Sequence, residues 1–231
     1  MITRFTISHQ RTLISKRFEV AVPKDFKPIY NAHSGLKLPV ITNEDPYRMN
    51  MYQWGIIPFD ARDSHIAEKL LNARKQTIKA KQPFCDLVDS KRCIIPMDGY
   101  FVWHEKHNVS TPYRVTLKTD ELFGVAGVWD TWKVDDEDSM FQTFSIITVP
   151  ANDLTKEFND RMPAILPLKK EKQWIEDMKE EDIETMLTTF PAELMRKYKV
   201  QPYLNDLDLN HRKVIKEKNL PQMGDTLSLF G

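Results

Sequence analysis

The feature that most constrains the fold is a series of five β-rich segments in the middle of the chain. The segments span residues 92–95, 100–103, 112–117, 122–132 and 140–149. Pro96 and the Asp98-Gly99 pair separate the first two, because proline cannot donate to a strand ladder and Asp-Gly favours a turn. Polar connections join the second segment to the third and the fourth to the fifth, as in hairpins. The middle of the chain is therefore predicted to form an antiparallel meander.

Helices and shorter strands are predicted around this meander. The helical candidates are Arg11–Phe18, a segment starting near His65 behind a cap at Asp63 or Ser64, part of 70–80, and residues 169–178, 181–188 and 192–198. Short strands are expected at residues 2–7, 36–42 and 49–57. The sequence has no internal repeat, no low-complexity linker and no sharp change in composition. It therefore predicts one α+β domain over residues 1–231.

The charges balance overall but are unevenly distributed. There are 33 basic and 33 acidic residues, so no net field selects a nucleic acid or a membrane as partner. Two segments, 1–18 and 69–81, are basic and contain no acid. They could meet on one face and bind an anion, or each could be an ordinary solvated surface. Spacing alone favours the second interpretation.

Neither a cofactor nor a metal is expected. The two histidines of His104-Glu105-Lys106-His107 are three residues apart in a predicted loop, whereas a zinc-protease motif needs them on one helical face. The 7 glycines include no phosphate-binding loop. Cys85 and Cys93 have no metal-ligand spacing and are predicted to be reduced and buried. No apolar run is long enough for a membrane span, so we expect a soluble, cytoplasmic protein without membrane partners.

Several polar residues lie within apolar surroundings and are candidates for a binding site. They are Asn72-Ala73-Arg74, Arg92, Asp98 and the pentapeptide Asn159-Asp160-Arg161-Met162-Pro163. Arginine and asparagine offer the forked or paired donors that suit phosphates and base edges. Nearby aromatic residues, Trp54, Phe59 and Trp103, could stack on bases. Taken by itself, the pentapeptide is more typical of a solvated turn in which Asp160 pairs with Arg161.

Six short motifs, taken in order, point to a known family. They are WGIIP at 54–58, NAR at 72–74 with Thr77, RCIIPMDGYFxW at 92–103, FxxAGxW at 123–129, IIT at 146–148 and DRMPxIL at 160–166. In order and spacing they resemble the SRAP family, the SOS-response-associated peptidases that process abasic sites. The resemblance covers roughly residues 1–205 and leaves 206–231 as a C-terminal tail. It implies a compact α+β fold around antiparallel, barrel-like sheets with peripheral helices, and a positively charged groove for single-stranded DNA.

The resemblance also implies a chemistry that this chain has largely lost. In the family, an N-terminal Cys exposed by removal of Met condenses with the aldehyde of an abasic site, and an Asn, a Glu and a His assist. Here those four positions are Ile2, Asn72, Val102 and Asn159. Only Asn72 is retained, and the bulky Ile2 disfavours removal of Met1. We therefore predict that cross-linking and autoproteolytic release are absent.

The DNA-contacting side is better preserved. The positions that match the family's groove are Arg4, Asn31, Arg74, Thr148 and Arg161, with Phe59 near its aromatic wedge. Ser34 replaces a usual proline, which suggests a remodelled pocket. The leading hypothesis is a degenerate SRAP-type protein that binds single-stranded or abasic DNA. The alternatives are a scaffold that binds another partner, and an abasic-site enzyme that uses a lysine or the Met1 amine. The oligomeric state stays open.

Overall fold

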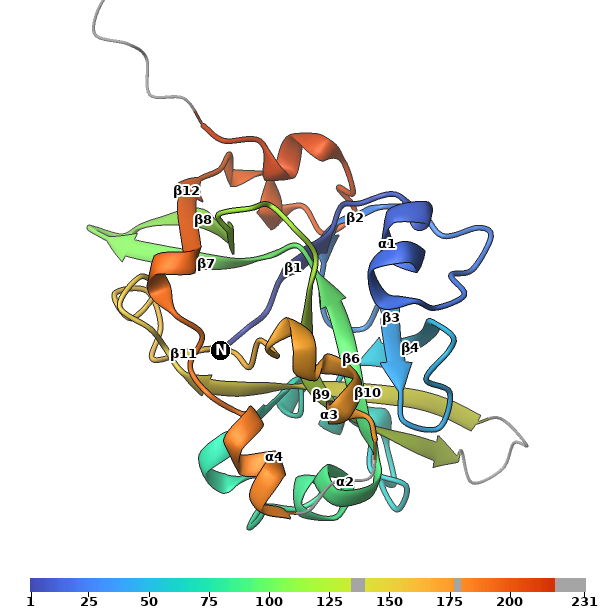
Figure 1. The fold of residues 1–231 in the computed structure, drawn as a ribbon. Coiled ribbons are helices and arrows are strands. Elements are labelled where there is room, and N and C mark those ends of the chain that lie inside the picture. Colours follow the sequence, from blue (N-terminus) through green and yellow to red (C-terminus); the bar gives the residue numbers. More distant parts are fainter. Residues whose placement is uncertain (134–139, 177–179, 219–231) are drawn as a thin grey trace, which may run out of the picture.

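The computed structural model describes residues 1–133, 140–176 and 180–218, and its strands form two sheets (Figure 1). The smaller sheet has the order β12-β8-β7-β1-β2. Its strands are β1 (Phe5–Ile7), β2 (Ile29–Ala32), β7 (Gly99–Lys106), β8 (Val109–Leu117) and β12 (Met195–Lys199). The larger sheet has the order β11-β10-β4-β3-β6-β9, and β5 also pairs with β10. Its strands are β3 (Lys37–Thr42), β4 (Asn50–Trp54), β5 (Asn72–Arg74), β6 (Arg92–Met97), β9 (Phe123–Lys133), β10 (Met140–Pro150) and β11 (Arg161–Pro163).

The larger sheet is barrel-like. Strand β9 pairs with β6 on one side and with β10 on the other, so the path β10-β4-β3-β6-β9 closes into a ring. Most pairings are antiparallel, but β10 runs parallel to β4 and to β5. The expected α+β fold with antiparallel, barrel-like sheets is confirmed, with these two parallel pairings added.

The five strands predicted for the middle of the chain are confirmed as β6 to β10, but they do not form one meander. The hairpins β7–β8 and β9–β10 lie in different sheets, and β6 pairs with β3 and β9 rather than with β7. One hairpin is longer than expected. Residues 104–111, expected to be a polar loop, lie mostly in β7 and β8. Only His107 and Asn108 form the turn, with φ of 50° and 61°, as a two-residue hairpin turn requires. Polar side chains do not oppose pairing in a hairpin that faces solvent. The acidic connection expected between β9 and β10 lies outside the described residues.

Several helix predictions are also confirmed. Helix α1 spans Arg11–Phe18, and the 3-10 helix η1 (Ser64–Lys69) starts behind Asp63, whose carboxylate accepts from the backbone N–H of His65 at 2.8 Å. The remaining helices are α2 (Phe84–Ser90), α3 (Glu171–Trp174), α4 (Glu180–Met186), η2 (Lys75–Thr77), η3 (Leu168–Lys170), η4 (Ala192–Leu194), η5 (Pro202–Asn205) and η6 (Arg212–Ile215). Within the described residues, no helix combines the length and apolar character needed to cross a membrane.

One helix prediction is wrong because strand pairing overrides local pattern. The helix expected at 192–198 is only one 3-10 turn, followed by β12, which pairs along the whole edge of β8 from Met195 to Lys199. Buried Met195 and Tyr198 have a spacing that suits a helix, but the open edge of β8 needs a backbone partner. The region 70–80 is helical in part, as predicted, because the 3-10 helix η2 follows β5, the strand that pairs with β10.

The apolar core joins the two sheets. Trp54 on β4 contacts Phe5 of β1 at a ring-centroid distance of 5.1 Å and Phe144 of β10 at 6.4 Å, and all three side chains are fully buried. Cys93 belongs to this core, as predicted, whereas Cys85 is only half-buried.

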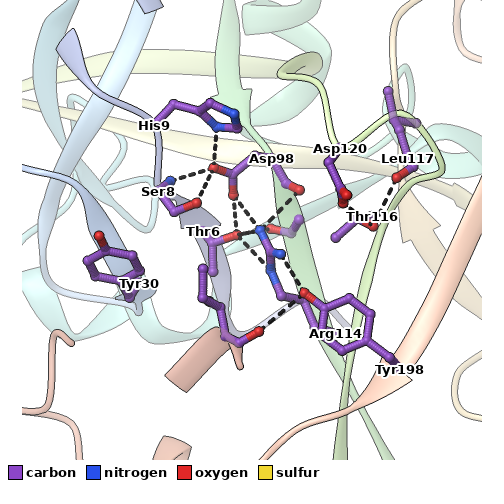
Figure 2. Close-up of polar contacts among 12 residues, drawn as sticks. Thr6, Ser8, His9, Tyr30, Asp98, Arg114, Thr116, Leu117, Asp120 and Tyr198 are labelled. Carbon is purple, nitrogen blue, oxygen red and sulfur yellow. Dashed lines mark hydrogen bonds and ion pairs between the residues drawn. The ribbon is translucent and has the colours of Figure 1, made fainter. Parts of the chain in front are cut away.

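A buried polar network ties β1 to two other strands of the smaller sheet, β8 and β12 (Figure 2). The carboxylate of Asp98, only 1% exposed, accepts from the Thr6 hydroxyl, from the backbone N–H and hydroxyl of Ser8, and from Arg114 at 2.7 Å, and it also contacts His9. The same guanidinium donates to the hydroxyl of Tyr198 at 2.6 Å. Since Thr6 and Ser8 closely follow the N-terminus, this network helps to fix where the chain begins its path through the fold.

Candidate functional site

The first two residues are held by two asparagine side chains. Asn72, on β5, donates its side-chain amide to the carbonyl of Ile2 at 2.9 Å. Asn159, just before β11, donates to the carbonyl of Met1 at 3.2 Å. The side chain of Ile2 is fully buried, whereas that of Met1 is 65% exposed. The N-terminus is therefore fixed between the segments that carry two of the predicted site residues.

Arg161, the first residue of β11, is buried, and its guanidinium is held by hydrogen bonds. Its guanidinium donates to the side-chain oxygen of Gln76 at 2.6 Å and to the hydroxyl and backbone carbonyl of Thr148. In the part of the chain that the structure describes, Arg161 forms no ion pair with Asp160. The pentapeptide is therefore not the turn with an Asp160–Arg161 ion pair that it suggested when taken by itself. Sequence reasoning missed Gln76, which carries no signal beyond following Arg74 by two residues.

Strand register brings a second arginine to the same place. In the parallel pairing of β5 with β10, Arg74 lies opposite Thr148, whose hydroxyl donates to the carbonyl of Ala73 at 3.2 Å. Arg74 is exposed, whereas Arg161 is only 6% exposed. Burial lowers the pKa of the Arg161 guanidinium, and the positive charge of Arg74 lowers it further. The two guanidinium groups therefore lie close enough for their charges to interact. Two neighbouring positive charges favour the binding of an anion.

The α-amino group of Met1 lies in the same electrostatic environment. Its partial burial lowers its pKa, and the charges of Arg74 and Arg161 lower it further, while Asp160 acts in the opposite direction. The site thus combines an amine that is easier to deprotonate than usual with two permanent positive charges.

Two polar atoms near the N-terminus are left without a partner. Among the described residues, Asn72 Oδ1 and Arg4 Nε are buried and make no hydrogen bond. Burial also lowers the pKa of Arg4. Buried polar atoms in proteins are rarely unpaired, so these two retain capacity for a ligand or water.

The remaining predicted residues lie elsewhere or are apolar. Val102 is buried on β7, opposite Tyr113 of β8. Asn31 is buried and donates its amide to the backbone carbonyl of Asp206 at 3.0 Å, beneath the C-terminal segment. Phe59 follows β4 and is 72% exposed. The structure therefore brings Asn72, Arg74, Thr148, Asn159 and Arg161 together around residues 1–2, but it does not link Asn31 or Phe59 to them by a hydrogen bond.

The histidines of the 104–107 motif do not form a metal site. His104 packs against the ring of Phe158 at a centroid distance of 5.6 Å, and His107 lies in the hairpin turn. Within the described residues, no group of three or more His, Cys, Asp or Glu side chains is arranged to hold a metal ion.

Comparisons with known proteins agree with the motif pattern. A family model described as "SOS response associated peptidase (SRAP)" matches residues 1–207. The abasic site processing protein YoaM of Bacillus subtilis is 32% identical over 226 residues, covering 95% of this chain and 99% of the relative. The abasic site processing protein YedK of Escherichia coli is 25% identical over 185 residues, covering 76% and 79%. A crystal structure of a Bacteroides thetaiotaomicron protein superimposes with a TM-score of 0.86 at 27% identity, covering 94% of this chain and all of that one.

Proposed function

The chain belongs to the SRAP family, and from this premise we propose that it binds single-stranded DNA, including abasic strands, without forming a cysteine-dependent cross-link. The relatives are named as abasic site processing proteins, which makes a DNA strand with a missing base the expected ligand. The observation that carries the proposal is that two arginines lie against Thr148: Arg74 is opposite it in the β5–β10 register, and Arg161 donates to its hydroxyl.

Phosphate contacts are expected to dominate this binding. Arg74 is exposed and can approach a phosphate, and among the described residues Arg4 keeps one unpaired donor. Arg161 is held by Gln76 and Thr148, so it contributes mainly a fixed positive charge. Each neutralised phosphate on a single strand steepens the salt dependence of log K by about 0.7, so affinity should fall markedly as salt rises.

Three side chains support the loss of the cross-linking chemistry. Position 2 is Ile2, which has no thiol and is fully buried in the core. Val102 is buried and cannot transfer a proton. Asn159 uses its amide to hold Met1 rather than to move protons. A stable thiazolidine forms when a thiol and an amine both bond to the aldehyde carbon of the abasic site. Ile2 does not supply the thiol.

Fluorescence anisotropy with a labelled single strand tests the binding. We expect binding of intact and abasic strands at low salt that weakens steeply as salt rises. Arg74→Gln should weaken binding several-fold and reduce the salt slope by about 0.7. Arg48→Gln, an exposed arginine beside Asp45, is the matched control and should bind like the wild type.

The same assay distinguishes DNA binding from the main alternative, a scaffold that binds another partner. If neither strand binds at low ionic strength, the DNA proposal fails and a scaffold that binds another partner becomes the better explanation. If Arg74→Gln and Arg48→Gln lose affinity equally, binding is a property of general charge and not of the site at the N-terminus.

A further inference from the structure

We propose that the protein has a second binding site, which follows β1 and takes the phosphomonoester of a nucleoside. The phosphate belongs either to a free mononucleotide or to the end of a DNA strand, since both present the same chemistry. The inference goes beyond the proposed function, because it uses other residues than Arg74 and Arg161 and does not require a strand beside the N-terminus.

The site is a cavity of about 430 Å³ where the start of α1 meets β2 and the 3-10 helix η6. Its lining includes His9, Gln10, Leu13, Tyr30, Arg212 and Ile215. No acidic residue in the described part of the chain lines it, although the protein as a whole has as many acidic as basic residues. The volume is in the range of small-molecule sites and exceeds what a phosphate alone would fill.

His9 is oriented by a buried carboxylate. Its Nδ1 lies 2.8 Å from Oδ2 of Asp98, which is only 1% exposed (Figure 2). An ionised carboxylate can only accept, so Nδ1 carries the proton, and this bond fixes both the tautomer and the direction of the ring. Among the described residues, Nε2 has no hydrogen-bond partner. It can therefore accept from a protonated phosphate or, after taking up a proton, donate to a phosphate oxygen.

The negative charge of Asp98 does not cancel the basic groups of the cavity. Arg114 faces the other carboxylate oxygen, Oδ1, at 2.7 Å and balances its charge. Arg212 is exposed and forms no ion pair among the described residues. His9 and Arg212 thus bring two basic groups to one cavity. Two such groups suit a phosphomonoester, which carries close to two negative charges, better than a phosphodiester with one.

The rest of the lining suits the nucleoside that carries the phosphate. Leu13 is apolar but 47% exposed, and Ile215 and Tyr30 line the same cavity. An aromatic ring and two aliphatic side chains give a base or a sugar an apolar surface to pack on. Gln10, whose side chain makes no cap bond to α1, adds an amide. Ligand sites commonly combine an apolar lining with a few polar groups that fix the orientation.

Isothermal titration calorimetry with thymidine 5′-monophosphate is the first test, and thymidine is the control ligand. We expect thymidine to bind about tenfold more weakly or not at all, because it lacks the charged acceptor. A second assay uses fluorescence anisotropy to compare single strands that differ only in a 5′-phosphate or a 5′-hydroxyl. Preference for the phosphorylated strand without binding of the mononucleotide identifies the strand end as the source of the phosphate.

Two variants assign the binding to the cavity. Arg212→Gln removes an exposed charge and should weaken phosphate binding by about tenfold. His9→Gln should act similarly, because glutamine cannot take up a proton. Lys213→Gln is the matched control, since Lys213 is exposed and follows Arg212 in η6 but does not line the cavity. Urea unfolding shows whether His9→Gln disturbs the contacts of Asp98, and if it does, Arg212→Gln decides.

The possible outcomes are distinct. Weaker binding in Arg212→Gln and His9→Gln, with Lys213→Gln like the wild type, supports the inference. It is overturned if neither the mononucleotide nor the phosphorylated strand binds better than its unphosphorylated counterpart. Equal losses in Arg212→Gln and Lys213→Gln, or full affinity in a stably folded His9→Gln, overturn it as well. These results leave the proposed function standing, because Arg74→Gln tests the site at the N-terminus separately.

Discussion

Replacing Asp98 by Asn should cost the fold a large share of its stability. The two side chains have nearly the same volume, so the change leaves no cavity. It does remove the negative charge that faces Arg114 at 2.7 Å, in a place where both side chains are almost fully buried. It also replaces one of the two carboxylate oxygens, to which Thr6 and Ser8 donate, with an amide group that is itself a donor. Breaking a buried pair in this way costs about 3 to 5 kcal/mol.

The lower end of this range applies here. Arg114 keeps its bonds to the hydroxyl of Tyr198, to Thr6 and to the backbone carbonyl of residue 98, so it is not left without acceptors. We therefore expect a loss of about 3 kcal/mol. With a urea dependence of about 2.5 kcal/mol/M, the unfolding midpoint should fall by about 1.2 M.

Urea unfolding followed by tryptophan fluorescence measures this shift. The matched control is Asp153→Asn, because Asp153 is 87% exposed and its ion-pair partner, Lys156, is exposed too. The control should move the midpoint by a few tenths of a molar at most, since exposed ion pairs contribute little. If both variants give the same small shift, the reasoning about the buried network is refuted.

The pH dependence of the unfolding free energy gives an independent check that the ionised carboxylate of Asp98 stabilises the fold. Burial alone raises the pKa of Asp98, but His9, Arg114, Thr6 and Ser8 together hold it well below its ordinary value of 3.8. A carboxyl whose pKa is depressed in the folded state stabilises the protein above its unfolded pKa, and this contribution is lost as pH falls toward the folded pKa. The difference between the wild type and Asp98→Asn should be constant near neutrality and should narrow below about pH 4.

Two further outcomes are expected. Ile2→Cys alone should not give an efficient heat-stable adduct with abasic DNA on a denaturing gel, because Val102 and Asn159 still occupy the assisting positions; a strong adduct would show that those groups matter less than we infer. In the native protein, a thiol reagent such as DTNB should modify Cys85 well before Cys93, because Cys93 is fully buried and burial raises the pKa of its thiol; equal rates, with unfolded protein as the reference, would contradict this.

Local patterns in the sequence were sufficient for much of the fold. Alternation and turn residues predicted the strands β6 to β10, although not their division between two sheets, and the cap at Asp63 and the helix Arg11–Phe18 were also predictable. These features depend on residues close together in the chain, so they can be found one segment at a time. The order of the motifs between residues 54 and 166 likewise predicted the family whose model matches residues 1–207.

The site was only partly predictable for the same reason. Asn72, Arg74, Thr148 and Arg161 could be named from motifs, but the support of Arg161 by Gln76 depends on how β5 and η2 meet β11. Asn31 was named from its place in the family motif, but the bond from its amide to the carbonyl of Asp206, which is 175 residues away in the chain, was not predictable. No local pattern connects residues so far apart.

The sequence by itself determined which residues are present at the reactive positions, and therefore that Ile2 has no thiol and that Val102 is no acid. It also determined most strands and α1, because alternation and capping are local properties. Only the tertiary structure decided that residues 195–199 form a strand, since this depends on the open edge of β8. It alone placed the Met1 amine beside Arg74 and Arg161, because desolvation and charge act through space and not along the chain.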